Sequence, residues 1–299
     1  MDYSFLNIDK CNMCNADAST FYVIGKRLNS SQGLNPKKKI GITTTICKCT
    51  KCGLVFSNPM PVPKSLDMHY GVPAESYWND DYFILDDNYF KTQINTFKSI
   101  YKNNSFVKAL DIGAGIGKCM LSLEKNGISA FGIEPSKPFY DKAISVMNID
   151  ENRIINTDIE NANFNKEEFD FITFGAVLEH LYNPYKSIEK AMEWLKPNGL
   201  IHIEVPYSKW LTGRIINFIY RLRGMDYVAN ISPMHNPFHL YEFELNSFVK
   251  NSKLLNYNIK YHKHMIADTY LPKIMDPLIK PLMRATNTGM QLEVWLKKV

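Results

Sequence analysis

The sequence predicts an α/β fold in which helices cover both faces of a mostly parallel sheet, preceded by a small Cys-rich module. Three observations carry this prediction. Apolar strand-like segments alternate with amphipathic helical segments from about residue 105 onward. A glycine-rich turn follows the first of these strands. Five of the six Cys residues lie within the first 52 positions.

The elements of this alternation can be placed one by one. Predicted strands cover 106–112, 128–134, 153–157, 169–174 and 200–205, and predicted helices cover 118–126 and 138–147. A further helix begins at Asn183-Pro184, which supply an N-cap and a first-turn proline. Residues 196–199, Lys-Pro-Asn-Gly, stop it before the next strand.

After residue 205 the alternation is interrupted. We interpret 206–241 as an insertion, followed by a helix near 244–254 and strands near 255–261 and 290–297. The complete sheet is then Rossmann-like and seven-stranded, with a late antiparallel strand. The predicted domains are the module at 1–60, connecting aromatic helices at 61–104, and the α/β domain at 105–299.

Composition narrows the class of protein. Of 299 residues, 45% are hydrophobic and 22% are charged, which is typical of a soluble globular chain. There is no apolar run of about 18 residues and no basic-then-apolar leader, so we expect a cytoplasmic protein. The net charge is 35 − 30 = +5, but only six of the basic residues are Arg. This scarcity argues against a nucleic-acid partner.

The Cys spacing indicates a metal site. Cys11-x-x-Cys14 and Cys49-x-x-Cys52 form two paired-Cys knuckles, the arrangement that tetrahedral Zn²⁺ prefers. Four thiolate ligands leave no open position, so the predicted Zn²⁺ is structural. The spacer 15–48 is expected to form an elongated hairpin, and Cys47 is a competing ligand. The alternative is a set of reduced, metal-free thiols.

The glycine turn, Asp111-Ile-Gly113-Ala114-Gly115, indicates a nucleotide-type cofactor. Glycines allow the backbone to turn tightly and to approach a ligand closely. Glu134, at the end of the next strand, can accept hydrogen bonds from ribose hydroxyls. A nicotinamide fingerprint requires a third glycine where this chain has Lys118, so that alternative is disfavoured.

At these residues the chain resembles the class I S-adenosylmethionine-dependent methyltransferases over roughly 105–299. Segments 109–115, 132–136, 156–160, 169–181 and 195–200 resemble that family's motifs in their order. The resemblance implies S-adenosylmethionine as cofactor, with Glu134 on the ribose and Asp158 near the adenine. The implied cofactor residues are Asp111, Gly113, Ala114, Gly115, Glu134, Pro135, Asp158, Ile159, Gly175 and Tyr77.

The Cys module and the aromatic segment with Tyr70, Tyr77 and Trp78 resemble the zinc-binding methyltransferases of bacterial sugars and polysaccharides. This resemblance implies methylation of a sugar in a nucleotide-linked or glycan precursor. We expect transfer to oxygen, and transfer to carbon is the alternative. The three aromatic residues would then wall the cofactor or the acceptor. Methylation of a non-sugar small molecule or a phosphorus-containing group, methylation of RNA, and cofactor binding without turnover remain alternatives.

A hydroxyl acceptor requires a base within hydrogen-bond reach. Our candidates are His239, in the insertion, and His180 with its neighbour Glu179, after the fourth strand. Some methyltransferases of quinone precursors bind a metal through Glu-x-x-Glu-His, but the first Glu position here is Ala176, which argues against a metal. His202 alternates with apolar residues in a strand and is expected to be structural.

The segment 210–223 has one apolar helical face and contains three of the six Arg residues. One interpretation is a lid helix that packs on the core. The other is a basic amphipathic surface that makes a peripheral membrane contact. The sequence leaves this choice and the oligomeric state open.

Overall fold

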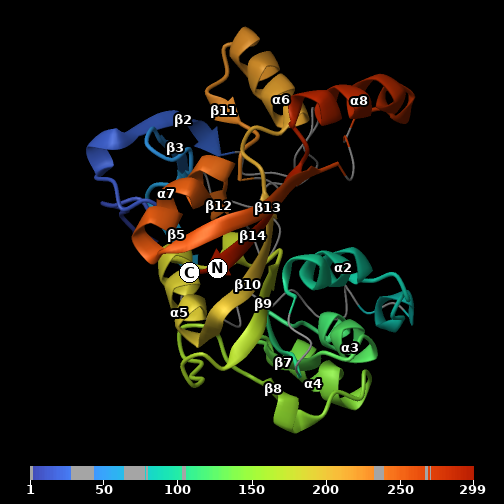
Figure 1. The fold of residues 1–299 in the computed structure, drawn as a ribbon. Helices are drawn as coiled ribbons and strands as arrows, with labels where there is room; N and C mark the ends of the chain where they lie inside the picture. Colours follow the sequence, from blue (N-terminus) through green and yellow to red (C-terminus); the bar gives the residue numbers. More distant parts are fainter. Residues whose placement is uncertain are drawn as a thin grey trace.

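A seven-stranded sheet forms the centre of the protein (Figure 1). The computed structural model describes residues 3–27, 44–63, 78, 80–102, 106–231, 239–266, 269 and 271–299. The strand order is β13-β14-β10-β9-β6-β7-β8. Strand β14 runs in the direction opposite to the other strands of this sheet, which are parallel to one another. The strands are β6 (Lys108–Ile112), β7 (Ser129–Ile133), β8 (Ile154–Ile155), β9 (Phe169–Gly175), β10 (Leu195–Pro206), β13 (Tyr257–Met265) and β14 (Gln291–Lys298). The predicted α/β fold, with its late antiparallel strand, is confirmed.

Helices cover both faces of this sheet (Figure 1). On one face α2 (Lys91–Ile100), α3 (Lys118–Lys125) and α4 (Lys137–Ser145) bury a cluster that includes Phe97 and Leu123. On the other face lie α5 (Pro184–Trp194) and α7 (Leu245–Leu255). As predicted, Asn183 caps α5, because its side chain accepts a hydrogen bond from the Lys186 N–H at 3.1 Å.

The N-terminal Cys module is a second sheet of five strands, ordered β11-β2-β3-β4-β12. Its strands are β2 (Phe21–Arg27), β3 (Thr45–Cys49), β4 (Val55–Ser57), β11 (Tyr227–Val228) and β12 (Tyr241–Glu242). Strands β2 and β3 pair antiparallel and form the two arms of the hairpin expected in the spacer. Strand β11 lies in the predicted insertion and β12 at its end, so the module combines the N-terminal segment with residues from about 200 positions later in the sequence.

The described part of 61–104 differs from the connecting helices that we expected. It opens with strand β5 (Met60–Pro63), which pairs with β1 (Tyr3–Leu6) in a two-stranded sheet. Its prolines are tolerated there because both strands are edges. Within the described residues of this range there is one α-helix, α2, and the 3-10 turn η3 (Asp80–Phe83) precedes it.

Two further helices, α6 (Leu211–Leu222) and α8 (Asp276–Thr286), stand out beyond the end of the sheet (Figure 1). Helix α6 was predicted from the sequence, whereas α8 was not. The short 3-10 turns are η1 (Ala18–Thr20), η4 (Glu151–Arg153), η5 (Leu178–His180) and η6 (Lys273–Met275). None of the helices in the described ranges has the length and apolar content of a membrane span.

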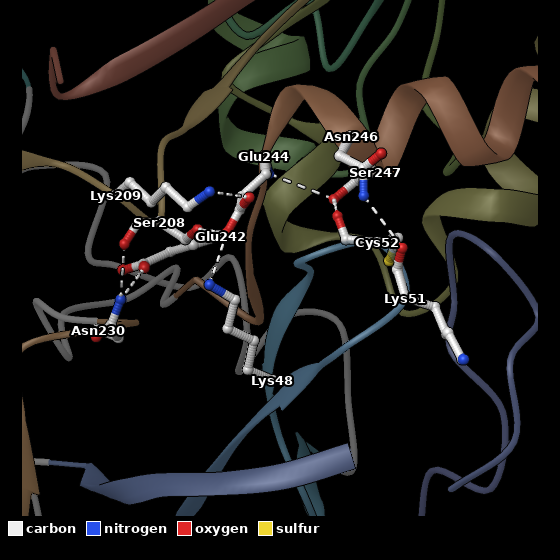
Figure 2. A network of polar contacts seen from close by, with 10 residues as sticks. All are labelled: Lys48, Lys51, Cys52, Ser208, Lys209, Asn230, Glu242, Glu244, Asn246 and Ser247. Carbon is white, nitrogen blue, oxygen red and sulfur yellow. Dashed lines mark hydrogen bonds and ion pairs between the residues drawn. The ribbon is translucent and has the colours of Figure 1, made fainter. Parts of the chain in front are cut away.

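The N-terminus of α7 joins the module to the α/β domain (Figure 2). Glu244, the N-cap of α7, accepts ion-pair contacts from Lys48 of β3 and Lys209 of the insertion, each at 2.6 Å. Ser247 then donates a hydrogen bond to the Cys52 carbonyl at 3.1 Å. Gly53 is required beside this contact, since a Cβ there would lie 2.5 Å from the Glu244 carboxyl carbon. The second Cys knuckle is therefore fixed against the α/β domain.

Candidate active site

A cavity of about 220 Å³ opens at the carboxyl ends of the parallel strands. Four segments that follow β6, β7, β8 and β9 line it, together with Phe139 of α4. Parallel α/β sheets bind ligands at this edge because the loops that leave the strands converge there. The lining residues are Ile112, Gly113, Gly115, Ile133, Glu134, Pro135, Ser136, Phe139, Thr157, Asp158, Ile159, Ala176, Val177, His180 and Leu181.

The glycine turn forms one wall of the cavity. The N–H groups of Gly113 and Ala114 both donate to the Ile133 carbonyl at 2.9 Å, which fixes the turn to the end of β7. Gly113 has φ = +72°, and a Cβ there would lie 2.6 Å from a methyl carbon of Val177. Both observations explain why glycine is required at this position.

Glu134 is buried beside the glycine turn, at the end of β7. Its two oxygens accept the backbone N–H groups of Gly115 at 2.7 Å and Ser136 at 2.8 Å. A carboxylate has about four acceptor sites, so two remain for a ligand. Burial raises the pKa of Glu134 to about 7, although both backbone hydrogen bonds act in the opposite direction.

A second cavity, of about 290 Å³, adjoins the first and shares Gly113 and Ala176 with it. Three predicted cofactor residues, Asp111, Ala114 and Gly175, line this second cavity rather than the first. Its other lining residues are Tyr89, Phe90, Gln93, Cys119, Thr173 and Glu204.

The second cavity is acidic. Burial and the nearby charge of Glu134 raise the pKa of Asp111 to about 7, which a hydrogen bond with Cys119 partly offsets. Burial is the largest influence on the Glu204 pKa and raises it, but hydrogen bonds with His202 and Gln93 and the charges of His202 and Lys263 together outweigh burial and lower the pKa. Gln93 of α2 donates to Glu204 at 2.7 Å. These carboxyl groups make the cavity suitable for a cationic group.

Glu179, His180 and His239 come together beside the first cavity. Each offers a donor atom within 4.8 Å of the others, and Nε2 of His239 lies 3.9 Å from Oε1 of Glu179. The centroids of the two imidazole rings are 4.9 Å apart. The Leu240 N–H donates to the Glu179 carbonyl at 2.8 Å and so holds the end of the insertion on η5.

Glu179 is deeply buried and electrostatically unusual. Only 2% of its surface is exposed, and its Oε2 has no hydrogen-bond partner in the described part of the chain. Burial, with a smaller contribution from the charge of Glu204, raises its pKa to about 8. A carboxyl group of this kind can share a proton with a neighbouring imidazole near neutral pH.

The four predicted metal ligands Cys11, Cys14, Cys49 and Cys52 also converge, with sulfurs within 4.8 Å of one another. The Cys11–Cys52 and Cys14–Cys49 sulfur distances are 3.5 and 3.7 Å, too long for disulfides. Four sulfurs bonded to a tetrahedral Zn²⁺ at about 2.3 Å would lie about 3.8 Å apart. The residues present therefore fit Zn²⁺, and Cys47 is not part of the cluster.

Comparison with known families identifies the α/β domain. A family model described as a methyltransferase domain matches residues 90–257, which is more than half of the chain. The chain belongs to this methyltransferase family. The resemblance of this domain to methyltransferases is thus confirmed at the level of the family.

Curated relatives of this methyltransferase match only in part. "Ubiquinone biosynthesis O-methyltransferase" of Coxiella burnetii is 28% identical over 129 residues, 42% of this chain and 52% of the relative. The protein of that name from Actinobacillus pleuropneumoniae is 28% identical over 160 residues, 50% of this chain and 62% of the relative. The chain thus spans about half the length of the curated relatives it matches.

Solved structures of similar proteins were also found. One is a SAM-dependent methyltransferase from Archaeoglobus fulgidus, 15% identical, with a TM-score of 0.46 over 71% of this chain and 95% of that one. Another, from Methanosarcina mazei, is 16% identical, with a TM-score of 0.49 over 69% and 97% of the two chains.

The structure places the other predicted residues of the methyltransferase as follows. Tyr70 and Tyr77 lie outside the described residues. Trp78 lines neither cavity and packs against Lys142 of α4, whose ammonium lies 4.9 Å from its ring centroid. His202 is fully buried, as expected, and its Nδ1 is hydrogen-bonded to Thr173 Oγ1 at 2.8 Å.

Several lining residues were missed by the sequence analysis. Glu204 lies near the carboxyl end of β10, so the rule that ligands bind at that edge could have identified it. Tyr89 and Gln93 carry no comparable signal, because their place at the site depends on how α2 packs over the strand ends.

Proposed function

We propose that this methyltransferase transfers the methyl group of S-adenosylmethionine to a hydroxyl oxygen of a small-molecule acceptor. The observation that carries the proposal is the convergence of Glu179, His180 and His239 beside the first cavity. A hydroxyl must lose its proton during methylation, and an imidazole supported by a carboxylate is a suitable base.

The two adjoining cavities suit the two ends of S-adenosylmethionine. Glu134 has unused acceptor capacity for ribose hydroxyls, and Ile133 and Ile159 offer apolar surface beside Asp158 for the adenine. The acidic second cavity, with Asp111 and Glu204, suits the ammonium group of the methionine part. When bound, the cofactor supplies an electrophilic methyl group on a sulfonium.

In the proposed reaction, His239 accepts the acceptor hydroxyl proton while the oxygen forms a bond to the methyl carbon and the carbon–sulfur bond breaks. Glu179, 3.9 Å from His239 Nε2, stabilises the resulting imidazolium when the Glu179 carboxyl is ionised, and the share of this ionised form grows as the pH rises toward the Glu179 pKa of about 8. The products are the methyl ether and S-adenosylhomocysteine. His180, which lines the cavity itself, is the alternative base.

Two acceptor classes remain for the proposal. The Cys module and its resemblance to sugar-modifying enzymes support a sugar of a nucleotide-linked or glycan precursor. The names of the curated relatives support a non-sugar small molecule instead. Both classes present a hydroxyl, so the proposed chemistry is the same for either.

We further propose that Cys11, Cys14, Cys49 and Cys52 hold a structural Zn²⁺. The sulfur distances and the four-thiolate donor set support this assignment. Such an ion would stabilise the knuckles that pack against α7 and has no open position for chemistry.

The test combines calorimetric titration with S-adenosylhomocysteine and turnover of labelled S-adenosylmethionine on nucleotide sugars and on phenols. His239→Ala should retain S-adenosylhomocysteine affinity and lose turnover about 10²–10⁴-fold, while the control His262→Ala, on β13, should retain both. Unchanged turnover in both His239→Ala and His180→Ala would refute the assignment of the base.

A further inference from the structure

The surface formed by α6 and α8 is not explained by methyl transfer. Six large apolar side chains on these helices and on η6 are between 41% and 87% exposed. They are Phe218, Leu222, Ile274, Met275, Leu278 and Leu282. Clusters of this size on a soluble protein usually mark a contact surface.

These apolar residues follow the helical repeat. On α6, Leu211, Ile215, Phe218 and Leu222 share one face, at spacings of three and four residues. On α8, Leu278 and Leu282 share a face that η6 extends with Ile274. The inward residues of the two helices are Thr212, Tyr220 and Met283, so each helix rests on the protein by its opposite side.

Basic residues accompany both apolar faces. Arg214 and Arg221 of α6 lie seven residues apart along one side of its apolar face. On α8, Arg284 is exposed, whereas Lys280 pairs with Asp276 at 2.9 Å. The segments 209–226 and 273–286 together contain seven basic and two acidic residues. Their net charge of 7 − 2 = +5 equals that of the whole chain, so the remaining residues sum to zero.

The two helices are anchored at one place. The Thr212 hydroxyl donates to the Thr269 carbonyl at 2.8 Å, and the Leu211 N–H donates to the Thr288 carbonyl at 3.2 Å. The start of α6 is thus hydrogen-bonded both to the segment that precedes α8 and to the segment that follows it. Since α6 follows β10 and α8 precedes the antiparallel β14, both leave the sheet at the edge that carries the two cavities.

We propose that α6 and α8 form a docking surface for an anionic membrane, in which the apolar faces enter the headgroup region and the flanking cations contact lipid phosphates. Amphipathic helices with aliphatic faces and basic flanks bind bilayers in this way. The exposed guanidinium groups beside these apolar residues, those of Arg214, Arg221, Arg223 and Arg284, support an anionic membrane rather than a protein partner. The proposal does not depend on which acceptor is methylated.

The experiment is flotation of the full-length protein with lipid vesicles. One set contains phosphatidylcholine, and in the other phosphatidylglycerol replaces about a third of it. The wild type should float with the anionic vesicles. The variant Phe218→Ser/Leu222→Ser/Leu278→Ser/Leu282→Ser should partition at least about tenfold less. The control Ile84→Ser/Phe106→Ser removes two side chains that are 62% and 76% exposed elsewhere, and it should float like the wild type.

A charge variant tests the electrostatic part. Arg221→Gln/Arg284→Gln should weaken partitioning to anionic vesicles about 30-fold, whereas the exposed pair Lys166→Gln/Lys253→Gln should change it little. S-adenosylhomocysteine affinity reports whether each variant is folded. Failure of the wild type to float with anionic vesicles would overturn the proposal. So would a concentration-dependent dimer that the four-serine variant loses while its flotation is unchanged, since a second copy would then cover the surface.

Discussion

The free energy of unfolding of Glu179→Gln, compared with that of the wild type, should increase as the pH rises. The same substitution should impair turnover. Burial raises the Glu179 pKa from 4.5 to about 8. The folded state therefore holds the proton more tightly than the unfolded state. The stability that the neutral carboxyl provides is complete below pH 4.5 and is lost as the pH rises toward 8. Glutamine is neutral throughout and does not show this loss.

The magnitude follows from the two pKa values. Between pH 5 and pH 7 an unfolded carboxyl of pKa 4.5 ionises almost fully, while the folded carboxyl stays mostly protonated. Linkage then gives a loss of about 2 kcal/mol of unfolding free energy in the wild type, which Glu179→Gln avoids. The Cys cluster and the other buried carboxyls are the same in both proteins, so their own pH dependence largely cancels in the difference.

The assay is urea unfolding at pH 5, 6 and 7, followed by circular dichroism on both proteins. The matched control Glu189→Gln makes the same chemical change at a carboxylate on α5 that pairs with Lys186. The difference between Glu179→Gln and wild type should grow by about 2 kcal/mol toward pH 7. A constant difference, or a Gln variant that becomes relatively less stable toward pH 7, would refute the reasoning about the buried carboxyl.

Three other substitutions test the remaining parts of the site. Glu134→Ala removes the predicted ribose acceptor and should weaken S-adenosylhomocysteine binding about 100-fold by calorimetry, whereas Glu124→Ala on α3 should not. Gly113→Ala places a Cβ 2.6 Å from Val177 and should lower the free energy of unfolding by about 1–3 kcal/mol in urea titrations. Cys52→Ser should abolish stoichiometric zinc release to a colorimetric chelator and lower the free energy of unfolding by several kcal/mol; an unchanged zinc content would contradict the four-Cys site.

Local patterns were enough to predict the α/β domain. The strands β6, β7, β9 and the second half of β10 are rich in apolar residues, and helix α5 carries both its N-cap and its first-turn proline in the sequence. These signals act over a few residues, so a single sequence contains them in full. For the same reason Asp111 and Glu134, which lie at strand ends, could be placed at the site in advance.

Elements that depend on distant partners could not be predicted. Strands β11 and β12 have two residues each and exist because they pair with β2 and β4, about 200 positions away in the sequence. Helix α8 was missed because Pro281 lies inside it, where proline normally breaks a helix. Met283 is the residue of α8 whose side chain is buried, so the helix shows little of the pattern that marks a core-facing element.

The proposed base is the part of the site that depends most on these distant contacts. Arg27 of β2, fully buried, donates to the His239 carbonyl at 3.4 Å, and Leu240 donates to the Glu179 carbonyl. Asn12, inside the first Cys knuckle, donates to the Tyr182 carbonyl just beyond η5 at 3.2 Å. The cofactor residues Gly113 and Glu134, in contrast, are held by strands of the main sheet. Loss of the Cys module should therefore reduce turnover more than S-adenosylhomocysteine affinity, because the module supports His239 and η5 but not the glycine turn.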